Sequence, residues 1–244
     1  MEVKKSRDTI QSLAIGISIL DVLADAKKPL KINEIQEKTQ ITKSNLYKYI
    51  NTLMRSSLIY RDEYTGTYQL GSRIIQYGMA AIGGQDIITN ITPYLQLISD
   101  HTENTTIFSI PTYNGPVITK INHSNQILNI GAELGTLLPP KSSAGKIYYV
   151  FSHERRAKEY INKFESTTKL DINEKMMIKE EKIAFAREPL ISEVSSVSIP
   201  VLNYVSELIG IITVVGFTSN IPATIDDPLC KYLQEMYAKI SLNF

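Results

Sequence analysis

The sequence is poor in residues that build covalent or metal-bound sites: its 244 residues hold one cysteine, three histidines and no tryptophan. A single cysteine, Cys230, excludes an internal disulfide and any site that needs paired cysteines, such as a CxxC zinc or redox motif. The histidines show neither HxH nor HExxH spacing, so the pattern supports no metal site and no acid–base dyad. We therefore expect no catalytic residue, no metal, no cofactor and no enzymatic activity.

Long apolar runs are also missing, because no stretch reaches the roughly 18 consecutive apolar residues that a membrane helix needs. The charged start of the chain, with Glu2, Lys4, Lys5 and Arg7, lacks the apolar core of a signal peptide. The composition of 43% hydrophobic and 21% charged residues is ordinary for a protein with a packed core. These features predict a soluble, cytoplasmic protein without a membrane partner.

The net charge of +1 hides an asymmetry along the chain. Residues 1–71 carry 11 Lys and Arg against 8 Asp and Glu, whereas the other residues carry 15 against 17. From Lys38 to Arg61 there are five basic residues and no acidic one. This basic field beside a mildly acidic body predicts a small polyanion-binding module on a larger domain. A basic surface patch without a partner is the alternative interpretation.

Residues 1–71 show three helical patterns followed by a hairpin pattern. Thr42 precedes the third helical pattern, and Thr is a favoured N-cap residue. Three helices and a hairpin form the winged helix-turn-helix layout, in which the third helix enters the DNA major groove. We expect helices over 9–26, 33–39 and 43–54, and strands over 58–61 and 67–70.

The third expected helix has one apolar and one polar face, with Leu46, Ile50 and Leu53 together on the apolar side. The opposite side presents hydroxyl, ammonium, amide and guanidinium groups and no acid, which suits base edges and phosphates. A solvated polar face is the alternative. In the hairpin, Asp62 and Glu63 would repel phosphate, so we assign the DNA contact of the wing to Tyr64 and Thr65. The expected DNA contacts are Lys43, Ser44, Asn45, Tyr47, Lys48, Asn51, Arg55, Arg61, Tyr64 and Thr65.

The rest of the chain interleaves helical and strand patterns, which predicts an α+β domain around one sheet. Gly83-Gly84 suits a hinge after a helix over 72–82. We expect further helices over 86–101, 142–152, 153–164, 173–182 and 226–242, and strands over 105–110, 117–122, 127–130, 194–201 and 208–215. The expected division is a DNA-binding domain (1–71), a linker helix and hinge (72–85) and a second domain (86–244).

A succession of short motifs covers nearly the whole chain and resembles the IclR family of bacterial transcriptional regulators. The motifs are Ser12-Leu13, Ile19-Leu20, Ile32-Asn33-Glu34-Ile35, Lys43-Ser44-Asn45-Leu46-Tyr47-Lys48, Tyr68-Gln69-Leu70-Gly71, Leu138-Pro139, Ser142-Ser143-Ala144-Gly145-Lys146 and Ser198-Ile199-Pro200-Val201. The resemblance implies a GAF-like effector-binding domain after the linker and dimers formed through the DNA-binding domains. The chain departs from the family pattern at Gln40, usually Gly, and at Lys48, usually Arg.

The resemblance also implies a site for a small organic effector between the Ser-Ala-Gly motif and the last two strands. Carried over by position, the effector-binding residues are Leu137, Ser143, Ala144, Ser196, Thr213 and Val215. Amides at a helix start suit a carboxylate, and hydroxyls would orient the ligand against apolar walls. Ala186, Ser196 and Val215 replace other residues of the family pattern, which favours a small carboxylate or aromatic acid with an apolar body. Tight helix–sheet packing of small residues is the alternative.

The predicted function is a sequence-specific transcriptional regulator, a repressor of a catabolic operon, whose operator binding responds to the effector. It would bind double-stranded DNA as a homodimer or a dimer of dimers. Two alternatives stay open: an activator of the same architecture, and a ligand-binding protein whose winged helix mediates protein contacts. A domain that has lost its effector response and serves oligomerisation is a further alternative for the second half.

Overall fold

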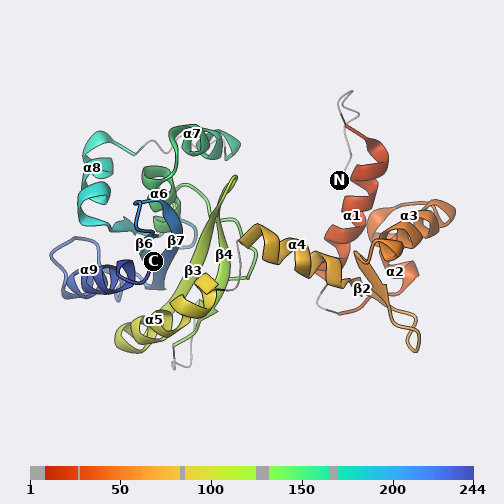
Figure 1. Ribbon diagram of the computed structural model, residues 1–244, viewed down its shortest axis with the longest axis horizontal. Coiled ribbons are helices and arrows are strands. Elements are labelled where there is room, and N and C mark those ends of the chain that lie inside the picture. The colour runs from red at the N-terminus through yellow and green to blue at the C-terminus, as the bar shows by residue number, and fades with distance from the viewer. Residues whose placement is uncertain (1–8, 27, 83–85, 125–131, 165–169) are drawn as a thin grey trace. The chain divides into compact units, whose positions relative to one another are not determined.

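A computed structural model describes residues 9–26, 28–82, 86–124, 132–164 and 170–244 (Figure 1). The chain divides into two compact units, Met1–Gln85 and Asp86–Phe244. The N-terminal unit contains α1 (Gln11–Asp25), α2 (Ile32–Thr39), α3 (Lys43–Arg55), β1 (Ile59–Arg61), β2 (Tyr68–Leu70) and α4 (Ser72–Ile82). The C-terminal unit contains α5 (Asp86–Thr102), β3 (Thr105–Thr112), β4 (Gly115–Asn122), α6 (Ser143–Phe151), α7 (Glu154–Lys163), α8 (Ile172–Glu181), β5 (Ala184–Ala186), β6 (Val194–Leu202), β7 (Leu208–Phe217) and α9 (Pro228–Ser241). Within the described ranges, no helix is long and apolar enough to cross a membrane.

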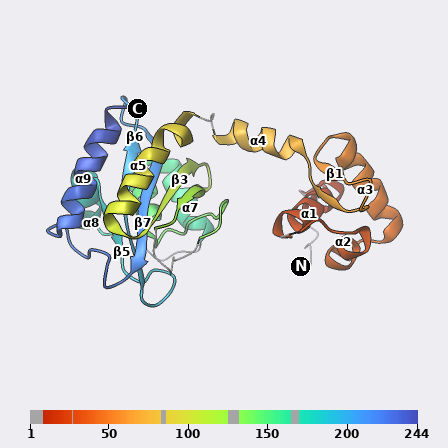
Figure 2. The ribbon, with the colours of Figure 1, turned by 90° about the horizontal axis from the view of Figure 1, so that it is seen from below.

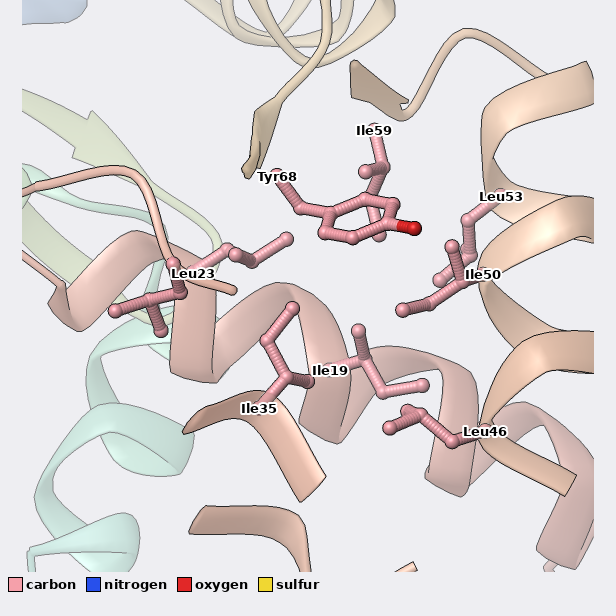
Figure 3. Packing of buried hydrophobic residues seen from close by; sticks show 9 residues of the cluster. Ile19, Leu23, Ile35, Leu46, Ile50, Leu53, Ile59 and Tyr68 are labelled. Atoms are coloured by element: carbon pink, nitrogen blue, oxygen red, sulfur yellow. The ribbon is translucent and has the colours of Figure 1, made fainter. Parts of the chain in front are cut away.

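Helices α1, α2 and α3 and the hairpin of the N-terminal unit share one apolar core (Figure 3). Leu46, Ile50 and Leu53 are buried in it, which confirms the predicted inner face of the third helix. The hairpin is tied to the helices by Leu30 and Tyr68, which exchange backbone hydrogen bonds of 3.0 and 2.7 Å. The three helices and the antiparallel pair β1–β2 form the predicted winged helix-turn-helix.

The turn between α2 and α3 keeps its shape although Gln40 replaces the expected glycine. Gln40 ends α2 in the left-handed region, at φ 56° and ψ 20°. A residue with a side chain costs about 1 kcal/mol or more in this region, where glycine is unstrained. The side-chain amide of Gln40 donates to the carbonyl of Glu37 at 2.6 Å, which helps to hold the turn. Thr42 occupies the predicted N-cap position of α3, but its side chain makes no capping hydrogen bond.

The C-terminal unit is built on a five-stranded antiparallel sheet with the order β4-β3-β7-β6-β5. Helices α5 and α9 pack on one face of the sheet (Figure 2). Helix α6 packs on the other face, with α7 and α8 outside it (Figure 1). Successive side chains of β6 point to opposite faces of the sheet. Val197 and Ile199 therefore point to one face, and Ser196 and Ser198 point to the other. This architecture agrees with the expected GAF-like α/β domain.

The predicted elements of the C-terminal unit that fall within the described residues are present, most with ends shifted by a few residues. Strand β5 was not predicted, because three residues are too few to show an alternating pattern. The expected strand over 127–130 and the Gly83-Gly84 hinge lie outside the described residues. Cys230 is fully buried in α9, and burial raises the pKa of its thiol to about 12.

Candidate DNA-binding surface and effector cavity

The outer face of α3 carries all of the DNA contacts predicted for that helix. Their side chains are exposed, and α3 has no acidic residue anywhere along its length. Burial of the opposite face holds this surface outward, because the two faces are separated by the helical period. The exposed residues are Lys43, Ser44, Asn45, Tyr47, Lys48, Asn51 and Arg55.

The wing is shaped by Asp62, whose carboxylate accepts hydrogen bonds from the amides of Tyr64 at 2.9 Å and Thr65 at 2.8 Å. The amide of Thr65 is the main cause that lowers the pKa of Asp62. Asp62 therefore has a turn-building role that the sequence prediction missed, although an Asp two residues before an exposed turn is a known signal for it. The turn presents Tyr64 and Thr65 as exposed side chains, and Arg61 is also exposed.

A cavity of about 110 Å³ lies between the start of α6, the sheet and the loop before β6. Five of the six predicted effector-binding residues line it: Ser143, Ala144, Ser196, Thr213 and Val215. The remaining lining is dominated by apolar side chains, including those of Ile107, Leu138, Leu190, Ile191 and Val194. A cavity of this kind suits a small molecule with an apolar body and one polar end.

Leu137, the sixth predicted effector-binding residue, is outside the cavity lining, and Leu138 lines the cavity instead. Leu137 forms an isolated β-bridge with Val117, and its side chain lies against Gly115 on the other side of the segment. Neighbouring residues of an extended segment point to opposite sides, so only one of the two leucines can face the cavity. Ala186, which pairs with Ser196 across the sheet, is also outside the lining.

Four buried hydroxyl groups form a hydrogen-bonded chain beside the cavity. Ser143 Oγ lies 2.7 Å from both Ser196 Oγ and Ser198 Oγ, and Ser198 Oγ lies 2.8 Å from Thr213 Oγ1. Ser198 was missed by the sequence prediction, although its position two residues after Ser196 on a strand was a usable signal. Three hydrogen bonds use three of the four hydroxyl protons, which leaves one proton available to an acceptor outside the chain.

The start of α6 adds backbone donors to the same cavity. Ser142 caps the helix, with its Oγ accepting from the amide of Gly145 at 3.0 Å and donating to the carbonyl of Pro139 at 2.7 Å. The amides of Ser143 and Ala144 belong to the first turn, where a helix offers no internal acceptor. Both residues line the cavity, so positive helix-end potential and unused donors coincide there.

Lys146, the last residue of the Ser-Ala-Gly-Lys motif, does not line the cavity and anchors α6 to neighbouring elements. Its Nζ lies 2.7 Å from Glu174 Oε1 of α8 and 2.7 Å from the carbonyl oxygen of Phe185 in β5. The ammonium group therefore joins three elements and is engaged outside the cavity. In the described part of the chain, no group of three or more His, Cys, Asp or Glu could hold a metal ion.

Two family models match the two units of the chain. The IclR helix-turn-helix domain matches residues 12–63, and the bacterial transcriptional regulator IclR C-terminal domain matches residues 79–242. The chain belongs to the IclR family. It is a DNA-binding transcriptional regulator with an effector-binding C-terminal domain, as the sequence motifs predicted.

Named relatives of this IclR regulator span nearly its whole length. It is 26% identical to the HTH-type transcriptional regulator XynR of Escherichia coli over 87% of this chain and 88% of XynR. It is 24% identical to the DNA-binding transcriptional repressor YiaJ of E. coli, over 95% and 86% of the two chains. Its fold matches the crystal structure of an IclR homologue from Microbacterium hydrocarbonoxydans complexed with 4-hydroxybenzoate, at a TM-score of 0.73 and 12% identity, over 96% and 98% of the chains.

Proposed function

We propose that this IclR regulator is a homodimeric repressor that leaves its operator when a small apolar carboxylate binds the cavity. Residues 1–71 would read the DNA, 72–85 would link the units, and 86–244 would bind the effector. The observation that carries the proposal is the convergence of unused α6 amides and a hydroxyl chain on one apolar cavity. The name of YiaJ supports repression, and an aromatic acid is the molecule bound to the Microbacterium homologue.

The cavity chemistry favours a carboxylate over a sugar. A carboxylate is an acceptor only, and the amides of Ser143 and Ala144 together with the spare hydroxyl proton are donors. The walls formed by Ile107, Leu138 and Val194 offer no partner for further polar atoms of a ligand. Burying an unmatched hydroxyl costs on the order of 1–3 kcal/mol, so a polyhydroxylated ligand would be rejected.

DNA recognition would use the exposed face of α3 and the wing. Ser44, Asn45, Tyr47 and Asn51 present groups for base edges, whereas Lys43, Lys48, Arg55 and Arg61 suit phosphates. Lys48 replaces an arginine of the family pattern and keeps its charge without the bidentate geometry, which favours a phosphate contact. In a two-fold symmetric dimer the half-sites would lie about 34 Å apart, or a multiple of that distance.

The test is fluorescence anisotropy of the full-length protein on labelled duplex from upstream of its own gene, at two salt concentrations. We expect nanomolar, salt-sensitive binding that exceeds binding to scrambled duplex, and release of the DNA by 4-hydroxybenzoate or a smaller monocarboxylate. Calorimetry would add xylose and other polyhydroxylated sugars as competitors. Tight binding of those sugars without binding of apolar acids would refute the effector class. Equal affinity for scrambled DNA in a library-wide screen would favour the protein-contact alternative.

An exposed apolar stripe on α1 supports the homodimer. Ile10, Leu13 and Ile17 are 70%, 61% and 48% exposed and follow one another at helical spacing. Exposed apolar stripes of this kind mark interaction surfaces. We propose that two copies of α1 pack against each other through these side chains.

Leu13→Glu combined with Ile17→Glu is expected to make the protein monomeric at micromolar concentration and to weaken operator binding at least 100-fold. The reason is that two glutamates would be buried against their own copies without partners. Light scattering after gel filtration measures the mass, and circular dichroism checks the fold. Leu242→Glu serves as the matched control, since Leu242 is 87% exposed and lies outside this stripe. A double variant that remains dimeric would contradict the assignment of the interface.

A further inference from the structure

An open groove of about 480 Å³ lies on the C-terminal unit, between α7 and α8. Both helices pack against α6 (Figure 1). Tyr149 and Val150 of α6 form the floor of the groove. Lys158 of α7 lies on one wall, and Lys175 and Met176 of α8 lie on the other. The groove shares no lining residue with the effector cavity, which is lined by the first residues of α6, whereas the groove is lined by residues near its end.

Helix α8 is apolar on two sides, and only one of them is packed. Ile178 is completely buried, whereas Ile172 is 75% exposed and Met176 is 54% exposed. These two exposed residues lie one turn apart on one face of α8. Met176 lines the groove, and Ile172 extends the apolar face beyond it. A helix that packs only against the core of its own domain is expected to carry polar residues on its exposed face.

The groove is lined by more lysine side chains than carboxylates, so it carries a net positive charge. Glu154 pairs with Lys158 at 2.7 Å. Lys175 Nζ lies 4.7 Å from the centre of the Tyr149 ring and 3.1 Å from its hydroxyl, and Lys179 is exposed. Among the described residues, neither Lys175 nor Lys179 forms an ion pair. Partial burial lowers the pKa of Lys182, and the nearby charge of Lys179 lowers it further.

We infer that this groove docks an acidic amphipathic helix from a partner protein. Its apolar anchors would cover Ile172 and Met176, and its carboxylates would pair with Lys175 and Lys179. A helix in a groove is a common mode of peptide recognition, and methionine adapts its shape to such partners.

The apolar stripe distinguishes this partner from nucleic acid, because phosphates and sugars gain nothing from burying Ile172 and Met176. The exposure of Met176 and Lys158 distinguishes it from a small molecule, because ligand pockets enclose most of the ligand surface. The lysines supply the charge complementarity that orients an acidic helix and speeds its association.

A displayed library of 16-residue helical peptides tests the inference against the full-length protein. The library varies two anchor positions between Leu and Ala and the flanking positions between Glu, Gln and Lys. We expect selected peptides to carry Leu at spacing i, i+4 with flanking Glu, and to bind with micromolar, salt-sensitive affinity in anisotropy. Lys175→Glu with Lys179→Glu should weaken this binding at least 10-fold. Lys231→Glu with Lys239→Glu makes the same charge change on the exposed side of α9 and should change it less than 2-fold.

Met176→Ser provides a second variant that alters no charge and should weaken the peptides at least 3-fold. Circular dichroism and operator binding should be unchanged in all of these variants. Selection without enrichment of Glu, or peptides that bind the charge-reversed variant equally well, would overturn the inference. A loss of duplex DNA affinity in the charge-reversed variant would assign the lysines to nucleic acid instead. A change in its oligomeric mass would assign the groove to a second copy of the chain.

Discussion

Gly145→Ala is expected to lower the free energy of unfolding of the C-terminal unit by about 2–4 kcal/mol. A Cβ atom at this position would lie 2.2 Å from the carbonyl oxygen of Pro139 and 2.7 Å from the hydroxyl of Tyr160. The carbonyl oxygen of Pro139 also accepts hydrogen bonds from the hydroxyl and the amide of Ser142, so it cannot move without disturbing the turn. The start of α6 must therefore shift away from the turn, and the Ser142 cap would be broken.

The helix propensity of alanine opposes this loss by only about 1 kcal/mol. At about 2–4 °C per kcal/mol for a unit of this size, the transition temperature should fall by about 4–16 °C. Calorimetry or circular dichroism measures this change. The matched control is Gly78→Ala in α4, where nothing lies within 4 Å of the added Cβ and stability should stay equal or rise. A Gly145→Ala protein as stable as the wild type would show that the approach of α6 to Pro139 is looser than described here.

Lys48→Ala is expected to weaken operator binding about 100-fold at moderate salt. A dimer would lose one phosphate contact on each half-site, so the loss of binding free energy per side chain is doubled. The slope of log affinity against log salt concentration should fall by about 2, roughly one for each lost contact. The loss should be similar for all operator variants, because a phosphate contact carries no base information.

Anisotropy titrations at three or more salt concentrations measure the slope. Lys239→Ala removes the same charge from an exposed position of α9 and should leave both affinity and slope unchanged. An unchanged slope together with an altered preference among operator variants would reassign Lys48 to a base contact. An affinity equal to that of the wild type would remove Lys48 from the DNA-binding surface.

The winged helix was predictable because its signals are local. The apolar period of α3 places Leu46, Ile50 and Leu53 on one side, and their burial follows from helix geometry once any core forms. The same geometry turns Lys48 and Asn51 outward without further information. The role of Asp62 was missed because the prediction considered only the repulsion between its charge and DNA phosphates. It did not consider the hydrogen bonds that the carboxylate accepts from two amides of its own turn.

The effector cavity was predictable in part, through motifs at each of its separate segments. Ser143 and Ser196 were named, but their hydrogen bond joins positions 53 residues apart, and only the folded sheet brings these together. The register of β6 against β7 puts Ser198 beside Thr213, which completes a chain of hydroxyls that no local pattern reveals. The choice between Leu137 and Leu138 also depended on register, since a shift of one residue reverses the direction of a side chain.

The sequence by itself determined the two units, the polar and apolar faces of α3, and the family, because periodicity, caps and motifs act over a few residues. The tertiary structure alone decided which hydroxyls meet beside the cavity, which residues of α6 line it, and that α7 and α8 leave a groove between them. These features depend on strand register and helix packing between segments that are distant in the chain. Such contacts form only when the whole core is buried, and no single segment specifies them.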